Sequence, residues 1–391
     1  DIYNLESSLL PVLIDMRMRG VRIDTDKAQQ VKKQLLTEEN KLIKEIHKWY
    51  GLKPDLWAAQ SLSQVFDRAG LEYPRTPKTD EASWLEAHDH KLPSTIARAR
   101  KLNKARTTFI DKMILEHLVD GRIHGELHPL RSDDGGTVTG RFSCSKPNLQ
   151  QVPARDPVIG PLIRSLFIPE EGHHWGCFDY SQQEPRLTVH YSVLTHQDGA
   201  EEAAIEYHDD DADFHQIVAD MANISRKEAK LINLGLSYGM GKEKLTKQLG
   251  ISPEEAELLF DQYHKRVPFV RGLRDSAARQ GANRGYVNTI LGRKCRFNLY
   301  EPIDRRAIPY PIDKAMEEYG GQLKRAYTYK EGIIAHTQVH DELNISVKNI
   351  QECEKVMEIM RDCVKLKVPN KVDGEIGKSW GHVVDYREYF K

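Results

Sequence analysis

The stretch "WGCFDYSQQEPRL", residues 175–187, begins as an apolar strand and changes character at Asp179. Three polar residues follow Tyr180, and a second carboxylate, Glu184, comes five residues after the first. Aspartate side chains are rarely buried unless they are paired or bind a metal ion. A strand that ends in a carboxylate, with another close behind, therefore predicts a functional site at the edge of a sheet.

A second acidic strand end occurs much later, in "AHTQVHDELNISV" (335–347). Apolar and polar residues alternate from Leu343 to Val347, as in a half-buried strand, and Asp341 lies where a hairpin would turn. Each aspartate alone is more simply interpreted as a turn residue. If the fold brings Asp179 and Asp341 together, their charges repel, and a divalent cation such as Mg²⁺, which favours oxygen ligands and phosphates, removes that cost.

The segment "SRKEAKLINLGLSYGMG" (225–241) places Arg226, Lys230, Leu234 and Tyr238 four residues apart, on one face of a helix. Two cations near a helix start, where the backbone N–H groups are also positive, form an anion site. The apolar and aromatic residues further along offer a surface for a base or sugar. An ordinary amphipathic helix would not usually place these four on one face, so the pattern predicts a bound nucleoside triphosphate.

The chain has 391 residues, of which 39% are hydrophobic and 29% charged, and this predicts two or three compact units. No apolar run is long enough for a membrane span, no signal peptide opens the chain, and the five cysteines form no C-x-x-C pair. We therefore expect an intracellular protein with reduced thiols and no zinc site. The order of helices, loop, strand, helices, hairpin and helix predicts a mixed α/β fold without βαβ repeats.

Two capping boxes, Ser225 with Glu228 and Ser252 with Glu255, predict the starts of two of the helices. The net charge of −1 argues only weakly against a nucleic-acid partner, because the distribution of charge matters more than its total. Residues 91–110 carry six cations and no acid, either as a solvated helix face or as a surface that follows phosphates.

Several segments resemble, in order and spacing, the motifs of family A DNA polymerases, the DNA polymerase I family. They are "DYSQQEPRL" (179–187), "RKEAKLINLGLSYG" (226–239) and "QVHDEL" (338–343) for motifs A, B and C, "TGRFSCSKPNLQQVP" (139–153) for the primer–template segment, "GYVNTILGR" (285–293), and the opening "LLPVLIDMRMRGVRID" (9–24). The sequence around the motifs is most similar to that of bacteriophage members of the family. The resemblance runs from about residue 6 to the end of the chain.

The resemblance implies a two-metal catalytic centre. Asp179 and Asp341 would hold two Mg²⁺ ions, for which Mn²⁺ could substitute, with help from the carbonyl of Tyr180. One ion would lower the pKa of the primer 3′-hydroxyl and the other would stabilise the leaving pyrophosphate. Arg226 and the catalytic Lys230 would neutralise charge on the β- and γ-phosphates.

The resemblance also assigns nucleotide and DNA contacts. Gln182 and His215 would surround the triphosphate, although His215 alone is more simply a core histidine. Glu184 would be the steric gate that excludes a ribose 2′-hydroxyl, and Tyr238 would close the floor beneath the template base pair. The implied DNA-binding residues are Arg98, Arg100, Lys101, Lys104, Arg141, Asn148, Gln150, Arg186 and His340.

The sequence departs from the family pattern in two ways. Leu234 replaces the usual phenylalanine or tyrosine, which predicts altered sugar discrimination and slower incorporation. The helix that normally precedes motif C, with its Gln-Gly-Ser/Thr-Ala-Ala-Asp motif, is missing between Lys330 and Glu331. We expect the natural molecule to carry such a stretch there. The segment 77–88 is also short for the family, and we expect a similar omission near Asp80.

The fold that the resemblance implies is the right-hand polymerase arrangement, with an antiparallel palm sheet and helical fingers and thumb. We place the N-terminal helices and thumb in 1–125, the palm in 126–199 and 284–391, and the fingers in 200–283. No acidic exonuclease motif precedes the polymerase segments, so we expect no proofreading from this chain. The helix 226–238 should swing toward the palm when a matching nucleotide binds.

The predicted function is template-directed addition of deoxynucleotides to a primer 3′-hydroxyl with release of pyrophosphate. The expected partners are primer–template DNA and dNTP, with no membrane, and the protein is expected to be a monomer in the cytoplasm of a bacterial host if a phage encodes it. Use of an RNA template stays open. One alternative is a single-subunit RNA polymerase, against which Glu184 and Glu342 argue. The other is a catalytically inactive nucleic-acid-binding remnant, against which the two aspartates argue.

Overall fold

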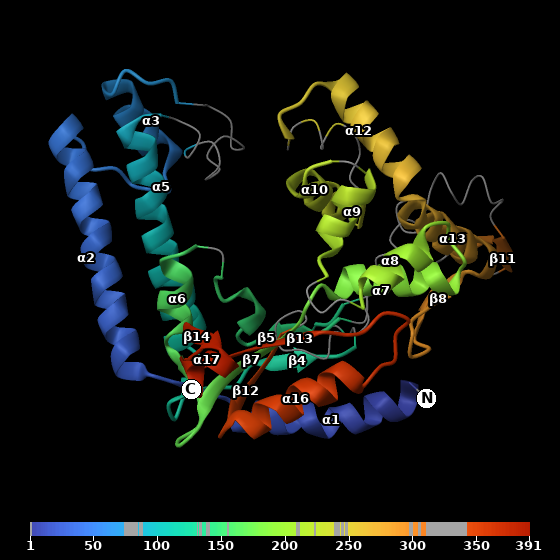
Figure 1. Cartoon of the computed structure of the whole chain (residues 1–391). Helices are drawn as coiled ribbons and strands as arrows, with labels where there is room; N and C mark the ends of the chain where they lie inside the picture. The colour runs from blue at the N-terminus through green and yellow to red at the C-terminus, as the bar shows by residue number, and fades with distance from the viewer. Residues whose placement is uncertain are drawn as a thin grey trace.

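The computed structural model describes residues 2–73, 85, 89–130, 132, 135–137, 141–154, 156–208, 212–222, 224–237, 243, 246, 249–296, 300–303, 306–309 and 342–391. Figure 1 shows two groups of helices, one containing α2, α3 and α5 and the other containing α9, α10, α12 and α13, that rise on either side of a sheet at the base. The sheet holds the strand that contains Asp179, so this arrangement positions the predicted site between the two helical groups.

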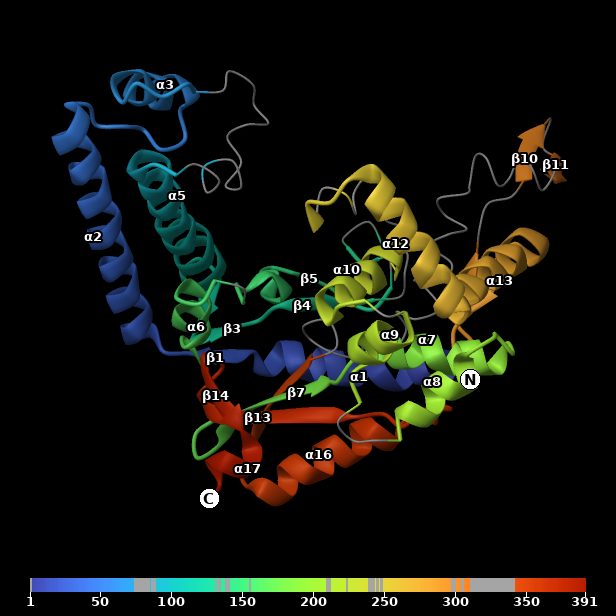
Figure 2. The ribbon, with the colours of Figure 1, turned by 45° about the horizontal axis from the view of Figure 1, so that its top comes forward.

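The central sheet has four antiparallel strands in the order β12-β7-β13-β14. Their bounds are β7 His174–Tyr180, β12 Glu342–Val347, β13 Val372–Ser379 and β14 His382–Asp385. One face packs through Phe178 and Ile376 on the helix α16, Ile350–Asp362, which lies along the sheet in both views (Figure 1 and Figure 2). Since side chains alternate along a strand, Asp179 belongs to the opposite face.

Smaller elements surround this sheet. A second antiparallel sheet, in the order β2-β3-β1-β6, joins short strands from distant parts of the chain, and β4 pairs with β5. The bounds are α1 Ile2–Arg19, β1 Val21–Ile23, β2 Leu118–Val119, β3 Arg122–Ile123, β4 Glu126–His128, β5 Ser143–Ser145, η3 Leu149–Gln151, α6 Ile159–Arg164, β6 Phe167–Ile168 and α17 Tyr386–Tyr389.

The expected thumb is built on three helices, α2 Thr25–Tyr50, α3 Ala59–Arg68 and α5 Lys91–Lys104, the last of which continues as a π-helical segment, η2 Ala105–Leu115. Apolar residues such as Ile46, Phe66 and Ile96 fill the core between the helices. Asp24 caps the start of α2 by accepting a hydrogen bond from the Lys27 amide, and Gly51 ends the helix with a φ of 71°. Glycine adopts this left-handed conformation without steric cost.

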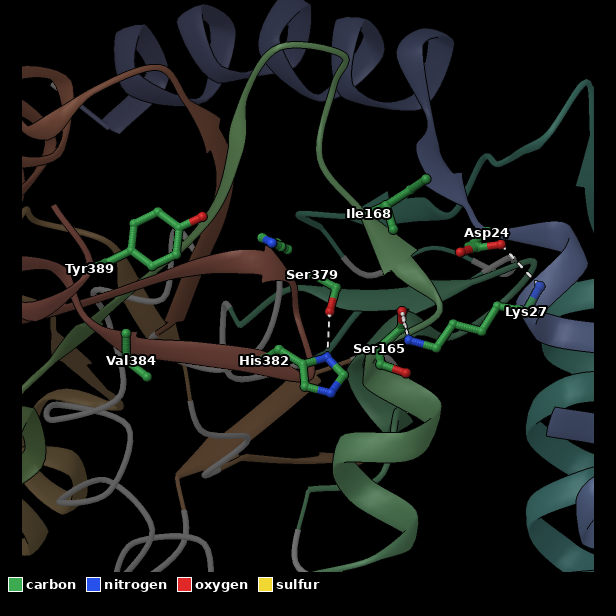
Figure 3. Close-up of a pocket in the computed structure, with 9 residues that line it drawn as sticks. Asp24, Lys27, Ser165, Ile168, Ser379, His382, Val384 and Tyr389 are labelled. Atoms are coloured by element: carbon green, nitrogen blue, oxygen red, sulfur yellow. Dashed lines mark hydrogen bonds between the residues drawn. The ribbon is translucent and has the colours of Figure 1, made fainter. Parts of the chain in front are cut away.

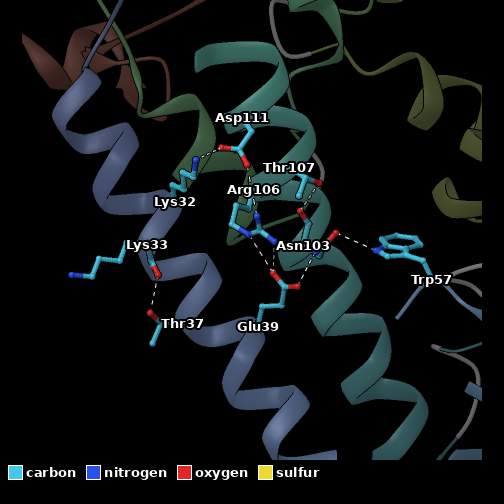
Figure 4. Close-up of polar contacts among 9 residues, drawn as sticks. All are labelled: Lys32, Lys33, Thr37, Glu39, Trp57, Asn103, Arg106, Thr107 and Asp111. Atoms are coloured by element: carbon cyan, nitrogen blue, oxygen red, sulfur yellow. Dashed lines mark hydrogen bonds and ion pairs between the residues drawn. The ribbon is translucent and has the colours of Figure 1, made fainter. Parts of the chain in front are cut away.

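A buried polar cluster joins α2 to α5 and η2 (Figure 4). Glu39 is 6% exposed and accepts hydrogen bonds from Asn103 at 2.7 Å and from Arg106 at 3.1 Å. The indole of Trp57 donates to the Asn103 Oδ1 atom at 3.2 Å, which ties the loop before α3 to the same cluster. A more exposed ion pair, Lys32 to Asp111 at 2.6 Å, lies at the edge of the contact.

The expected fingers consist of helices around a separate core that contains Tyr207, Phe214, Tyr263 and Phe269. Ser225 with Glu228, and Ser252 with Glu255, make the reciprocal hydrogen bonds of capping boxes, which confirms both predicted helix starts. The bounds of these helices, and of the elements that come before and after them in the chain, are α7 Gln183–Leu194, α8 Ala200–Glu206, α9 Phe214–Ala222, α10 Arg226–Ser237, α12 Pro253–Arg266, α13 Pro268–Arg284, β8 Tyr286–Asn288, β9 Lys294–Arg296, β10 Tyr300–Ile303 and β11 Arg306–Pro309.

The predicted strands 175–179 and 343–347 are confirmed as β7 and β12, and they are neighbours in the sheet. The predicted helix 226–238 is α10. Asp341, His340, Tyr238 and the Lys330–Glu331 and Asp80–Glu81 junctions lie outside the described residues. The boundaries proposed for thumb, palm and fingers stay predictions.

Replacing Glu39 with alanine should destabilise the contact between α2 and α5. Removing one partner of a buried ion pair costs roughly 3–5 kcal/mol, and Arg106 keeps a second carboxylate, Asp111, at 3.7 Å, so we expect a loss of about 2–3 kcal/mol. Amide hydrogen exchange in α2 and α5 measures this as faster opening. The control, Lys32→Ala, breaks an exposed pair and should change opening by less than about 1 kcal/mol. Equal effects of the two substitutions would contradict the prediction.

Candidate active site

Three carboxylates form a row across the central sheet. Asp179 on β7 lies directly opposite Glu342 on β12 and directly opposite Asp373 on β13. Asp179 and Asp373 are exposed, and Glu342 is half-buried. Facing residues on antiparallel strands have Cβ atoms about 4.5–5.5 Å apart, and like charges in such positions repel. The end of the sheet therefore concentrates negative charge on the face opposite α16.

The negative charge of this row also affects Glu375, which lies further along the same face of the sheet. Glu375 follows Asp373 by two residues on β13. Burial raises the pKa of Glu375, and the charges of Glu342 and Asp373 raise it further, while Arg164 lowers it. The neighbouring carboxylates thus oppose the ionisation of Glu375, an effect that a bound cation would relieve.

The chemistry of the row fits a hard divalent cation, because carboxylate oxygens are the ligands that Mg²⁺ prefers. Within the described ranges, however, no group of three or more His, Cys, Asp or Glu side chains is arranged closely enough to hold a metal ion. The backbone beside Asp179 is well anchored. The Tyr180 hydroxyl donates to the Met360 carbonyl at 2.7 Å, and the Ser181 amide donates to the Lys371 carbonyl at 2.9 Å.

Gln182 ties the end of β7 to the start of the helix α9. It adopts a left-handed conformation, φ 52° and ψ 43°, which costs a non-glycine residue on the order of 1–2 kcal/mol. Its side-chain oxygen accepts from the Phe214 amide at 2.7 Å, and its side-chain nitrogen donates to the Ala212 carbonyl at 3.0 Å. The strained turn therefore fixes the start of α9 next to the acidic row.

The predicted steric gate, Glu184, belongs to the start of the helix α7. Glu184, in its first turn, accepts an ion-paired hydrogen bond from Arg141 at 3.0 Å, with side chains that are 28% and 35% exposed. Two predicted site residues that are distant in the sequence are thus brought together. The pair holds the Glu184 carboxylate in one orientation, as a gate residue would require.

The anion site predicted from the sequence lies at the start of α10, where Arg226 is located. Arg226 donates to the Asp213 Oδ2 atom from Nε at 2.8 Å and from Nη2 at 2.5 Å. Lys230, one turn further, is exposed. Burial lowers the pKa of the half-buried His215, Asp213 raises it, and Lys230 and Arg226 lower it, so the three basic groups lie within electrostatic reach of one another. Leu234 belongs to α10, but its side chain is not described.

Two predicted DNA contacts are corrected by the structure. Arg186 is 2% exposed, donates to the carbonyls of Ser181 and Pro369 at 2.9 and 2.5 Å, and stacks on Tyr207. Arg100 is 8% exposed and donates to the Leu56 carbonyl at 2.7 Å. Backbone carbonyls hold both guanidinium groups in the interior, so both residues stabilise the fold and do not present a phosphate-binding surface.

The other three predicted DNA contacts on α5 are accessible. Lys101 and Lys104 are exposed on α5 and Arg98 is half-buried. Lys101 lies 4.0 Å from Asp156, whose pKa is lowered chiefly by the Ile159 amide hydrogen bond and further by the charges of Lys101 and Arg98, against the effect of burial.

Asn148 and Gln150, predicted to contact DNA, lie in the turn around η3. The Asn148 side chain accepts from the Gln150 amide at 3.1 Å, and the Gln150 side chain donates to the Phe142 carbonyl at 3.4 Å. Both are half-buried. In this structure they order the segment that carries Arg141, and their contact with DNA stays a prediction.

A pocket of about 510 Å³ lies between the start of α2, the end of α6 and the strands β13 and β14 (Figure 3). Lys27 donates to the Ser165 carbonyl at 3.4 Å, and Ser379 lies 3.0 Å from the His382 Nδ1 atom. Its lining contains none of the predicted site residues. Asp24, which also lines it, offsets part of the lysine charge, and we assign the pocket no function.

Sequence reasoning missed Asp213, Asp373 and Asn233. Asp213 precedes His215 by two residues, and its partner Arg226 is on the next helix, which spacing alone does not reveal. Asp373 lies in the alternating "VDGEIGKS", where polar residues mark one face of a strand, but its neighbour in the sheet could not be inferred. Asn233 lies between Lys230 and Leu234 on α10, and its side chain contacts His215.

An antiparallel sheet carries carboxylates at its exposed end, and Gln182 ties this end to α9, which packs on α10 with its two cations. This arrangement is compatible with the core of a nucleic-acid polymerase. The sequence model described as "DNA polymerase family A" matches residues 25–382. The chain belongs to this family.

Related proteins share most of this chain. It is 36% identical to a "DNA-directed DNA polymerase" of Pseudomonas phage M6, over 97% of this chain and 66% of the relative, and 32% identical to "DNA polymerase I, thermostable" of Thermus filiformis, over 96% and 47%. The chain thus spans about two thirds of the phage relative and about half of the bacterial one. The phage alignment runs over 444 residues, more than the 391 of this chain, so that relative has internal stretches that this chain lacks.

A solved structure supports the fold. The POL domain of Pol1 from M. smegmatis, in complex with DNA primer-template and dNTP, matches with a TM-score of 0.76 and 26% identity over 96% of this chain and 70% of that chain. The likeness confirms the predicted right-hand polymerase fold, with its antiparallel sheet and flanking helices. Of the helices in the described parts of the chain, none is both long and apolar enough to cross a membrane.

The ion pair between Asp213 and Arg226 should make the stability of the expected fingers depend on pH. Burial raises the Asp213 pKa, but the hydrogen bond and charge of Arg226 and the His215 amide outweigh it, and the net pKa is lowered. A lowered pKa stabilises the fold above the unfolded-state pKa of about 3.9, and this contribution is lost as pH falls through the folded-state value.

Calorimetry from about pH 5 down to about pH 3 tests this. The unfolding temperature of Asp213→Asn should lie below that of the parent at the upper end, and the gap should close as pH falls. The control is Asp220→Asn on α9, the helix that Asp213 directly precedes. The Asp220 carboxylate accepts only from Gln216 among the described contacts, and the difference in unfolding temperature between this variant and the parent should not change with pH. A parent–Asp213→Asn difference that is independent of pH would refute the prediction.

Proposed function

We propose that this chain is a template-directed DNA polymerase unit, which adds deoxynucleotides to a primer 3′-hydroxyl and releases pyrophosphate. The observation that carries the proposal is the cross-strand register that sets Glu342 opposite Asp179, in a chain that belongs to DNA polymerase family A. The solved relative was captured with a DNA primer-template and dNTP, the two partners proposed here. Family membership gives no support to an RNA polymerase or an inactive remnant.

Asp179 and Asp341 are proposed to hold two Mg²⁺ ions, together with the Tyr180 carbonyl. Glu342, which follows Asp341 in the sequence, lies directly opposite Asp179 in the sheet, and this register supports the proposal. Bound there, Mg²⁺ would lower the pKa of the primer 3′-hydroxyl and stabilise the pyrophosphate. The protein's own part is to fix the carboxylates on a rigid sheet, where their mutual repulsion favours cation binding.

The triphosphate is proposed to lie against the start of α10. Arg226 and Lys230 would neutralise the charge that develops on the phosphates, and His215 would donate a further hydrogen bond. Gln182, Leu234 and Tyr238 are proposed to complete the nucleotide site. Glu184, oriented by Arg141, would lie against the sugar and exclude a 2′-hydroxyl.

The duplex is proposed to follow the thumb. Arg98, Lys101 and Lys104 would contact phosphates without reading sequence, and Arg141 and His340 would contact the primer end. Contacts of this kind depend strongly on salt, because they release counterions from DNA. We propose a monomer that works inside the cell, and the phage relatives favour a bacterial host.

Primer extension tests the function. Asp179→Asn and Asp341→Asn should each lower the extension rate by at least about a hundredfold, because each removes a carboxylate proposed to hold the Mg²⁺ ions that stabilise the transition state. Binding of primer–template should be retained. The control is Asp198→Asn, in an exposed turn after α7, which should extend like the parent. Equal extension by all variants would overturn the catalytic assignment, and faster use of rNTP than dNTP would favour an RNA polymerase.

Leu234→Phe should increase the use of dideoxynucleotides or change the incorporation rate, because an aromatic ring can stack where leucine cannot. Termination assays with dNTP and ddNTP mixtures measure the ratio of incorporation. The control is Leu231→Phe on the same helix, outside the stripe formed by Arg226, Lys230, Leu234 and Tyr238. If Leu234→Phe leaves both the ratio and the rate unchanged, residue 234 does not contact the sugar.

A further inference from the structure

Three polar side chains from three helices form a hydrogen-bonded chain behind the proposed triphosphate site. The Tyr263 hydroxyl on α12 donates to the Asn233 Oδ1 atom on α10 at 2.5 Å, and the Asn233 Nδ2 atom lies 3.1 Å from the Nδ1 atom of His215 on α9. Tyr263 is completely buried and Asn233 is 6% exposed. The chain thus runs from the core of the helical unit to the half-buried His215.

The direction of these hydrogen bonds determines the proton position on the histidine. The hydroxyl hydrogen of Tyr263 engages Asn233 Oδ1, so the Asn233 nitrogen points toward His215, and an amide nitrogen can only donate. His215 Nδ1 must therefore accept. A neutral imidazole carries a single ring proton, which then resides on Nε2.

The protonation states of the chain agree with this assignment. Burial raises the pKa of Tyr263, so the phenol remains a donor across the physiological range. Burial, followed by the charges of Lys230 and Arg226, lowers the pKa of His215 against the opposing effect of Asp213. The ring is therefore neutral near pH 7.

We propose that Asn233 and Tyr263 are positioning residues that hold His215 in the Nε2–H tautomer, so that Nε2–H is the donor offered to a triphosphate oxygen. The role of the donor rests on the proposed function, whereas the tautomer is a property of the free protein. In the other tautomer, Nε2 would present a lone pair to an anionic oxygen. The buried chain thus provides a hydrogen-bond donor that does not require protonation of the ring.

Nitrogen-15 NMR of the His215 ring in the free protein tests the tautomer directly. The parent should show a protonated Nε2 and an unprotonated Nδ1. In Asn233→Asp the new carboxylate can only accept, so the proton should move to Nδ1 or the ring should become doubly protonated. Tyr263→Phe frees the Asn233 amide to rotate, and a mixture of tautomers is expected. A parent with its proton on Nδ1, or no change in either variant, would overturn the proposal.

Steady-state kinetics tests the consequence. In Asn233→Asp, the KM for dNTP should rise about tenfold at alkaline pH and approach the parent value at acidic pH, where the ring is doubly protonated. The parent KM should stay flat over the same range. The charged groups that face the ring, Asp213, Arg226 and Lys230, are present in both proteins and cancel in the comparison.

The matched control is Tyr207→Phe. Tyr207 is a buried tyrosine of the same helical core, and its hydroxyl has no hydrogen-bond partner among the described residues. This variant should leave the tautomer and the KM profile unchanged. Circular dichroism of each variant verifies the fold.

A double-mutant test separates positioning from general structural damage. If Asn233 acts through His215, Asn233→Asp should change the KM no further in a His215→Ala background, whereas independent effects would add. Additive effects would overturn the proposal. If the parent fails to extend primers, the proposed function fails while the NMR result still decides the tautomer. If extension is normal and the tautomer is insensitive to residues 233 and 263, this inference alone fails.

Discussion

The register between β7 and β12 is the constraint on which the rest of the structure depends. Phe178 and Leu343 share the face that packs on α16, so Asp179 and Glu342 must share the other face. Because side chains alternate, a slip of one residue would bury the carboxylates against α16 and expose the apolar residues. The hydrophobic contact with α16 therefore holds the acidic row on the opposite face.

The carboxylates at the end of the central sheet repel one another, and this repulsion favours the binding of a cation. Asp179, Glu342 and Asp373 lie in a row that disfavours the empty site, but two of them are exposed, where water screens them. The cations are on other elements, on α10 and along α5. A chain with a net charge of −1 can thus carry separate surfaces of opposite charge, which explains why its total charge is a poor guide to the partners proposed for it.

The sequence predicted those parts of the fold that local patterns determine. Alternation identified β12, the change from apolar to acidic identified the end of β7, and capping boxes identified the starts of α10 and α12. It failed for Arg100 and Arg186, because the carbonyls of Leu56 and Pro369 that hold them come from distant segments. A guanidinium group in a basic run or next to a motif gives no signal that it is buried. Two other contacts were not predicted because they also join distant segments: that of Asp373 with Asp179 in the sheet, and that of Asn233 with Tyr263.

The helix pair α9 and α10 carries two different kinds of polar group. Arg226 on α10 can exchange its partner, whereas His215 on α9 is held in one hydrogen-bonded state. The ion pair of Arg226 with Asp213 has side chains 51% and 28% exposed, and pairs of this kind contribute only about 0–1 kcal/mol. Replacing Asp213 by a triphosphate as the partner of Arg226 therefore costs little. His215 is different, since Asn233 and the buried Tyr263 limit its ring to one hydrogen-bonded state. A nucleotide arriving at α10 would meet an arginine that can move to it and a histidine already set to donate, and this division allows capture and orientation to be provided by different residues.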